Sequence, residues 1–168
     1  MEIRKSQYED IENIMKVINE AKQFFIDNQI FQWSPHYPNN DVIKNDIDKD
    51  TSFVVVDNDK IIGTFSLTIG EDNCYKNIYD GKWLSDDVYA TIHRLAISNA
   101  YKRQGIGNKI IQYSEKYCRE NKIKSIRIDT KELNLPMRKF IDKNNFTYCG
   151  IIKTEDYSNR VAYEKMLI

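Results

Sequence analysis

Hydrophobic residues recur along the first part of this chain at the spacing of a helix. From residue 7 to residue 27 they return every third or fourth position, which predicts a helix with one buried face. The apolar stripe consists of Tyr8, Ile11, Ile14, Met15, Ile18 and Phe25. The capping-box pattern Ser6-x-x-Glu9 predicts the start of this helix, and residues 2–5 predict a short strand before it.

The middle of the chain alternates between strand and helix patterns. Residues 52–57 and 61–68 predict an antiparallel hairpin around Asn58-Asp59-Lys60, and Asp41 predicts the cap of a short helix before it. Strands predicted over 88–97 and 123–130 enclose a helix predicted over 105–120. A helix that joins two neighbouring strands in this way places them parallel, with a right-handed connection.

The last part of the chain predicts one more helix and two strands. Asn134 can cap a helix over 135–144, and strand patterns follow at 146–152 and 160–167. The chain contains no internal repeat, linker or low-complexity segment. We therefore expect a single domain over residues 1–168, with an α+β fold built on a mixed, mostly antiparallel sheet.

Two irregular segments carry an unusual number of aromatic residues. Residues 31–38 contain two prolines, which exclude regular structure there, and residues 70–87 are long and polar. Their candidate substrate-binding side chains are Trp33, Tyr37, Tyr79 and Trp83. Acidic and aromatic groups together can receive a cation. The alternative to a substrate-binding role is packing on the core for residues 31–38 and a solvated insertion for residues 70–87. The sequence leaves these alternatives open.

Charge and composition exclude several classes of partner. Lys and Arg total 25, as do Asp and Glu, so the basic excess of a general nucleic-acid or acidic-membrane binder is missing. No apolar run is long enough to span a bilayer, and residues 1–5 lack the apolar core of a signal peptide. Three separated cysteines suit free thiols in a reducing compartment and form no metal cluster. We expect a cytoplasmic protein, either monomer or homodimer, with no metal.

Residues 92–111 read as a buried strand, a basic loop with two glycines, and the start of a helix. The backbone N–H groups at a helix start, together with Lys102 and Arg103, suit a phosphate or pyrophosphate. A P-loop is excluded because Gly107 is not followed by its Lys-Ser/Thr pattern. A dinucleotide fold is disfavoured because Ile110 replaces the third glycine and residues 98–104 separate the strand from the glycines.

The segment Lys102-Arg103-Gln104-Gly105-Ile106-Gly107 resembles the acyl-CoA motif of the GCN5-related N-acetyltransferase (GNAT) family, Arg/Gln-x-x-Gly-x-Gly/Ala. Lys102 departs from the first position of that motif and lacks the planar fork of Arg. The order of predicted elements also resembles the family over nearly the whole chain. Residues 126–130 with Asn134 add to the likeness, and Gln32-Trp33-x-x-x-Tyr37-Pro38 resembles one bacterial subgroup.

The resemblance implies a sheet whose central parallel pair splays into a V, with helices on both faces and acetyl-CoA as co-substrate. Backbone groups of Leu95, Ala96 and Ile97 would pair with the pantetheine arm like an added strand. Asn134 would hydrogen-bond the cofactor. The pyrophosphate would be held by the loop residues Lys102, Arg103, Gln104, Gly105, Ile106, Gly107 and Asn108.

The family transfers acetyl groups to amines, so a primary amine of a small molecule or peptide is the expected acceptor. His93 lies where members often carry a glutamate base and can accept a proton at neutral pH, directly or through water. Ile141 occupies the position of the usual tyrosine acid and cannot donate a proton. Tyr148, Tyr157 and Tyr163 are alternative donors. The missing acid leaves a non-catalytic acyl-CoA sensor or interaction module as the alternative function.

Overall fold

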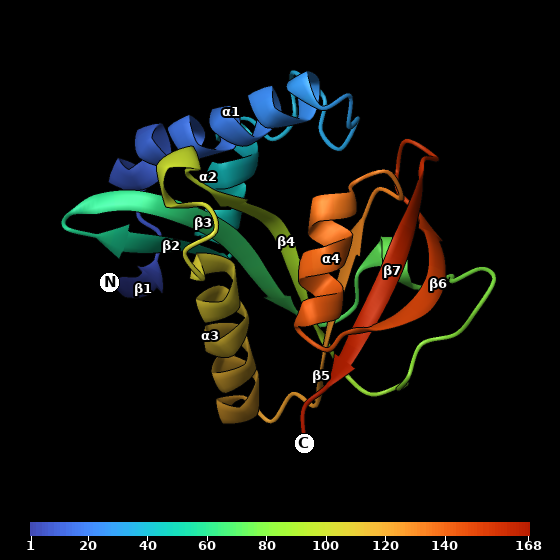
Figure 1. Ribbon diagram of the computed structural model, residues 1–168. Helices are drawn as coiled ribbons and strands as arrows, with labels where there is room; N and C mark the ends of the chain where they lie inside the picture. The colour runs from blue at the N-terminus through green and yellow to red at the C-terminus, as the bar shows by residue number, and fades with distance from the viewer. The chain divides into compact units, whose positions relative to one another are not determined.

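Seven strands form one mixed sheet in the order β1-β2-β3-β4-β5-β7-β6 in the computed structural model, which describes residues 1–168 (Figure 1). The strands are β1 Glu2–Lys5, β2 Ser52–Asp57, β3 Lys60–Ile69, β4 Ala90–Ile97, β5 Ser125–Thr130, β6 Thr147–Lys153 and β7 Asn159–Met166. The α-helices are α1 Ile11–Asp27, α2 Asn40–Asp48, α3 Ile106–Glu120 and α4 Leu135–Lys143. Strands β4 and β5 run parallel, with Ala90 opposite Ile126 and Thr91 opposite Arg127. The predicted α+β class is confirmed.

The chain divides into two compact units that share some of its elements. The first unit comprises Met1–Leu67 and His93–Ile110, and the second comprises Thr68–Ile92 and Ile111–Ile168. Strands β3 and β4 and helix α3 each contribute residues to both units.

In the first unit, helices α1 and α2 cover strand β2. Ile14 and Ile18 of α1, Ile43 of α2 and Val54 of β2 form one buried cluster, and each is at most 2% exposed. Burying a side chain of this size contributes about 1.5–3 kcal/mol, so the helical stripe predicted from the sequence is the main support of this layer. Figure 1 shows α1 lying across the strands of this unit.

The hairpin of β2 and β3 turns more tightly than its sequence predicted. Lys60 already pairs with Asp57, so the turn consists of Asn58 and Asp59 alone. Both have positive φ, 47° and 61°, as a two-residue hairpin loop that matches the strand twist requires.

Two predicted helix caps are wrong because the chain finds other partners. Ser6 is buried, and its hydroxyl receives a 2.8 Å hydrogen bond from Ser52, so Ser6 continues the β1–β2 pairing. The N–H of Gln7 instead donates to the Asp10 carboxylate at 2.7 Å. Helix α2 is capped by Asn39, whose side chain accepts from the N–H of Val42, and not by Asp41.

In the second unit, a buried ion pair joins β5 to β7. Arg127 and Glu164 are 5% and 0% exposed at their side chains, with Nε and Oε1 3.1 Å apart. The Arg127 guanidinium also lies 4.1 Å from the Trp83 ring centroid and 3.8 Å from that of Tyr89. Glu164 accepts from the backbone N–H of Leu84. The pair therefore fixes the second half of the 70–87 segment.

The middle of that segment is bound to strand β6. Tyr79 and Ile151 exchange two backbone hydrogen bonds of 2.8 Å. Gly81 runs so close to β6 that a Cβ there would lie 1.9 Å from the carbonyl oxygen of Cys149. This segment, which reads as a long loop, is anchored on the sheet.

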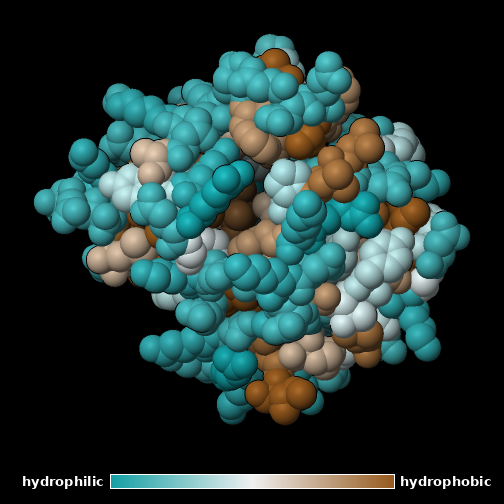
Figure 2. Space-filling model, viewed as in Figure 1, coloured by the Kyte–Doolittle hydropathy of each residue, from teal (hydrophilic) through white to brown (hydrophobic).

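One face of the molecule is mostly polar. Figure 2 shows a face dominated by hydrophilic residues, with hydrophobic residues in separate small groups. Phe31 and Tyr157 are among the most exposed large apolar side chains, at 82% and 86%. No helix is both long enough and apolar enough to cross a membrane.

The pH dependence of stability should reveal the Arg4–Asp10 pair. Two hydrogen bonds of 2.7 and 3.0 Å from Arg4 lower the pKa of Asp10. A carboxyl group whose pKa is lower in the folded protein than in the unfolded chain stabilises the fold at pH values above its ordinary pKa of about 4. This stabilisation is lost as the pH falls through the pKa that the group has in the folded protein. Asp10→Asn should therefore lower the free energy of unfolding by about 1 kcal/mol at pH 7, and the difference should vanish in acid.

Urea unfolding of both proteins between pH 7 and pH 2 measures this difference. Glu12→Gln is the matched control, because its pair with Lys16 is exposed at 83% and 66%. A constant Asp10→Asn difference across the pH range would contradict the assignment.

Candidate functional site

Strand β4 contains a residue in a conformation that strands rarely adopt. Arg94 has φ of 51°, in the left-handed region, although it is not glycine. Such a residue interrupts the regular alternation of backbone N–H and C=O groups along a strand. The interruption falls immediately before Leu95–Ile97, the segment predicted to pair with the cofactor.

The Arg94 side chain is held by a carboxylate of α2. Its Nε and Nη2 both donate to Asp46 at 2.7 Å, and the two side chains are 15% and 8% exposed. Burial by itself would lower the pKa of Arg94, but Tyr37 and Asp46 outweigh it and raise the pKa. Arg94 therefore stays charged and fixed in place.

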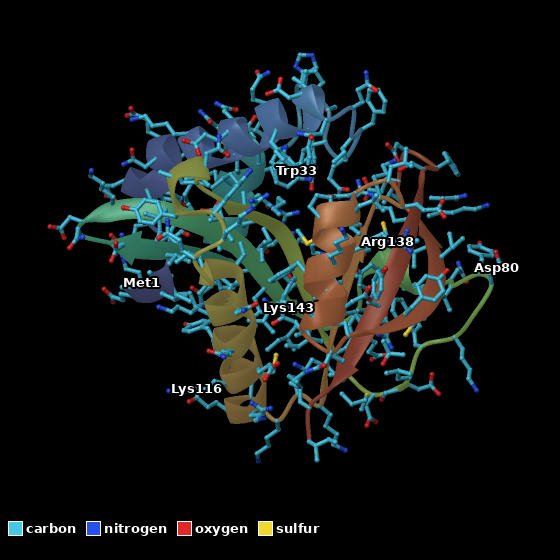
Figure 3. All side chains as sticks on the ribbon, viewed as in Figure 1. Met1, Trp33, Asp80, Lys116, Arg138 and Lys143 are labelled. Atoms are coloured by element: carbon cyan, nitrogen blue, oxygen red, sulfur yellow. The ribbon has the colours of Figure 1, made fainter.

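The aromatic loop 31–38 is attached to the same arginine. Nη1 of Arg94 donates to the Tyr37 hydroxyl at 3.0 Å. Trp33, labelled in Figure 3, packs edge-on against Phe25 with ring centroids 5.3 Å apart. Lys22 of α1 donates to the carbonyl oxygens of Pro35 and Pro38, at 3.2 and 2.6 Å. Of the two predicted substrate-binding residues in this loop, Trp33 is half-buried and Tyr37 is 39% exposed.

The loop between β4 and α3 presents backbone amides at a helix start. The first hydrogen bond inside α3 runs from the N–H of Lys109 to the carbonyl oxygen of Gly105, at 3.2 Å. The first turn of a helix directs its backbone N–H groups away from the helix body, and the helix dipole adds positive charge there. Gly105 has φ of 79°, and a Cβ on it would meet nothing within 4 Å. The space in front of this backbone is open.

Polar contacts fix the first part of this loop. The N–H of Asn99 donates to Glu20 of α1 at 2.6 Å, and the Gln104 side chain donates to the carbonyl oxygen of Ala100 at 2.9 Å. Arg103 is exposed, with φ of 62°. The loop is therefore held in a defined shape by its own backbone and by α1.

Lys102, the residue that departs from the family motif, lies over an aromatic ring. Its Nζ is 4.1 Å from the ring centroid of Phe24 on α1. Burial lowers the pKa of Lys102, opposed by the charge of Glu20. The Lys102 ammonium therefore lies against α1, next to Phe24 and within the electrostatic influence of Glu20.

The predicted proton-transfer residues fall in different units. His93 lies half-buried on β4 in the first unit, next to Arg94. Ile141 is fully buried in α4 of the second unit. The Tyr163 hydroxyl accepts from Arg138, also labelled in Figure 3, at 3.2 Å, and Tyr157 is 86% exposed.

The remaining predicted site residues belong to the second unit. Asn134 is 3% exposed and caps α4 by accepting from the N–H of Met137 at 3.4 Å. The indole of Trp83 donates to the carbonyl oxygen of Tyr75 at 3.0 Å. The ring of Tyr79 is 45% exposed and lies 4.9 Å from the Lys153 ammonium. Of these three side chains, that of Tyr79 is the most exposed and therefore the most accessible to a ligand.

Sequence reasoning missed the Asp46–Arg94 pair. A carboxylate on the inward face of an amphipathic helix and a charged residue inside a strand are both unusual, and that was the available signal. The two residues are 48 positions apart, so only the fold shows that they meet.

Comparisons with known proteins show which family and which structures the chain is similar to. A family model described as Acetyltransferase (GNAT) family matches residues 14–146. A GNAT-family acetyltransferase structure from Streptococcus agalactiae 2603 is 30% identical, with a TM-score of 0.88, over 98% of this chain and 94% of that one.

Two further matches are more distant. Streptothricin acetyltransferase A of Bacillus subtilis (strain 168) is 27% identical over 90 residues, which are 53% of this chain and about half, 50%, of that relative. The Thermoplasma acidophilum PaiA N-acetyltransferase, solved in complex with coenzyme A, has a TM-score of 0.72 at 20% identity, over 98% of each chain. At this identity the likeness concerns the fold.

Proposed function

Because this chain belongs to the acetyltransferase (GNAT) family, we propose that its residues 1–168 act as one domain that transfers the acetyl group of acetyl-CoA to a primary amine. Family membership indicates acyl transfer. The choice of acetyl-CoA draws on the coenzyme A complex of the Thermoplasma acidophilum neighbour. The acceptor is a small molecule or a peptide. We place the reaction in the cytoplasm.

One observation carries the proposal: an open helix start and an interrupted strand occur together in the first unit. The backbone around Gly105 faces open space, and Arg94 interrupts β4 directly before Leu95. A cofactor with a pyrophosphate and an extended amide-bearing arm needs both features. In our proposal, the amides of Arg103 to Asn108 bind the pyrophosphate, and the backbone of Leu95 to Ile97 pairs with the arm. Asn134 is retained as a predicted hydrogen-bond partner of the cofactor.

The proposed reaction is direct attack by a neutral amine on the thioester carbonyl. The amine forms the new C–N bond, the C–S bond breaks, and coenzyme A leaves as the thiolate or thiol. His93, directly or through water, takes the proton of the ammonium. Backbone N–H groups stabilise the oxyanion of the tetrahedral intermediate.

A non-catalytic acyl-CoA sensor is the second candidate, and one observation favours it. Ile141, fully buried and aliphatic, occupies the position where the family usually has its tyrosine acid. An enzyme with this residue either protonates the leaving group from another tyrosine or releases coenzyme A as the thiolate, aided by solvent.

A thiol-release assay separates the two candidates. The protein is given acetyl-CoA with alkyl diamines, amino-acid amides, short peptides and streptothricin, the last because of the name of the Bacillus subtilis relative. The enzyme proposal expects release of coenzyme A that depends on the amine. Tight acetyl-CoA binding without release on any amine would establish the sensor instead.

Gly107→Asp should weaken acetyl-CoA binding about tenfold or more, because it adds a negative charge to the helix turn proposed to bind the pyrophosphate. An acidic residue in the first turn favours the helix itself, so α3 should persist. Calorimetric titration with acetyl-CoA measures the loss. Gly107→Ala, which adds a methyl group without charge, is the matched control and should bind nearly as wild type. Equal affinities of the Asp and Ala variants would refute the pyrophosphate placement.

His93→Ala should lower kcat/KM about 100-fold near neutral pH and remove the rise of activity with pH that a histidine base produces. A pH–rate profile on the best amine of the panel measures both effects. The chain has two histidines, so His36→Ala is the natural control, and it should leave the profile unchanged. If the His93→Ala profile keeps its shape, His93 is not the base.

A further inference from the structure

Tyr37 and Arg94 together present hydrogen-bond donors that the protein does not use. Of the five N–H groups of Arg94, two bind Asp46 and one binds the Tyr37 hydroxyl. Because that hydroxyl accepts from Arg94, its own proton remains available for another partner. The Tyr37 side chain is 39% exposed. The cluster of Tyr37, Arg94 and Asp46 thus offers donors to a ligand, and Asp46 balances the arginine charge.

The cluster lies beside the segment proposed to pair with the cofactor. Arg94 directly precedes Leu95 in β4. Ala96, two residues further, packs against Val17 and Ala21 of α1, with Trp33 against the same cluster. Loop 31–38 therefore contacts β4 through Tyr37, and its Trp33 packs against the cluster to which Ala96 belongs.

The tyrosine hydroxyl is held in place before any ligand arrives. Lys22 binds two carbonyl oxygens of the loop, the N–H of Tyr37 donates to the carbonyl oxygen of Ser34 at 3.2 Å, and Trp33 is packed on Phe25. A donor fixed in this way loses little entropy when it binds an oxygen atom.

We propose that the Tyr37 hydroxyl, with the remaining N–H groups of Arg94, binds a carbonyl oxygen next to the reacting amine of the acceptor. The site then selects amino-acid amides and peptide amino termini over simple alkylamines. A donor cluster that Asp46 keeps neutral suits an uncharged carbonyl. Tyr37 is the specificity residue, and Asp46 is a positioning residue that acts through Arg94. This inference rests on the proposed function and names its acceptor class.

The test compares an amino-acid amide with the alkylamine that has the same side chain and lacks the carboxamide group. Wild type should favour the amide in kcat/KM. Tyr37→Phe should reduce that preference about 3- to 10-fold, as expected for one hydrogen bond, and leave the KM for acetyl-CoA unchanged. An unchanged preference, or an equal loss on both acceptors, would overturn the proposal.

Two further variants distinguish the positioning role of Asp46 from a general loosening of helix α2. Asp46→Asn should reduce the amide preference as Tyr37→Phe does, since Arg94 loses its charged anchor. Tyr8→Phe also removes a tyrosine hydroxyl that donates to α2, at Asp48, but from outside loop 31–38, and should leave the preference unchanged. The same loss of preference in Tyr8→Phe would assign the effect to helix loosening and overturn the proposal.

Binding of the two acceptors to the coenzyme A-loaded protein is measured alongside turnover. If wild type releases no coenzyme A, the enzymatic proposal fails, but a tighter affinity for the amide that disappears in Tyr37→Phe still supports the carbonyl site. If wild type binds both amines with equal affinity, the proposed carbonyl site is wrong, whether or not turnover is observed. The proposed acetyltransferase function is not affected by that result.

Discussion

The ion pair between Arg94 and Asp46 is the constraint on which the proposed chemistry of the first unit depends. A non-glycine residue in the left-handed region costs about 1–3 kcal/mol and persists only where its surroundings fix it. Here the surroundings are two hydrogen bonds of 2.7 Å to a carboxylate that is itself 8% exposed. A buried pair of this kind is weak evidence for stability, but it defines one geometry. That geometry sets both the interruption of β4 and the position of the Tyr37 hydroxyl.

The second unit repeats this arrangement with different residues. Arg127 of β5 pairs with the buried carboxylate of Glu164 and lies over two aromatic rings, those of Trp83 and Tyr89. In each unit, an arginine from a central strand fastens an irregular, aromatic-rich segment to the sheet. The two segments that look least ordered in the sequence are therefore both anchored. Ser125 also donates to Glu164, at 2.7 Å, which further satisfies the buried carboxylate.

The elements of the fold could be predicted from the sequence because periodicity is a local property. The stripe that includes Ile14 and Ile18 and the capping residue Asn134 both depend on neighbours within a few positions. The prediction for Ser6 failed because its partner, Ser52, is 46 positions away. The cation–π contact of Lys102 with Phe24 could not be predicted for the same reason, since it depends on how α1 packs. The glycine-rich motif located the helix start, whereas the donors around Tyr37 required the three-dimensional structure.

The contact between Tyr79 and Ile151 has a consequence for the protein in a crowded solution. Strand β6 ends the sheet, and a terminal strand exposes backbone groups that can recruit a strand from another molecule. The two hydrogen bonds of Tyr79 occupy part of that edge, and Gly81 keeps the covering segment close because its missing Cβ leaves room for the Cys149 carbonyl. The 70–87 segment therefore also protects the molecule against intermolecular strand pairing and the aggregation that follows from it.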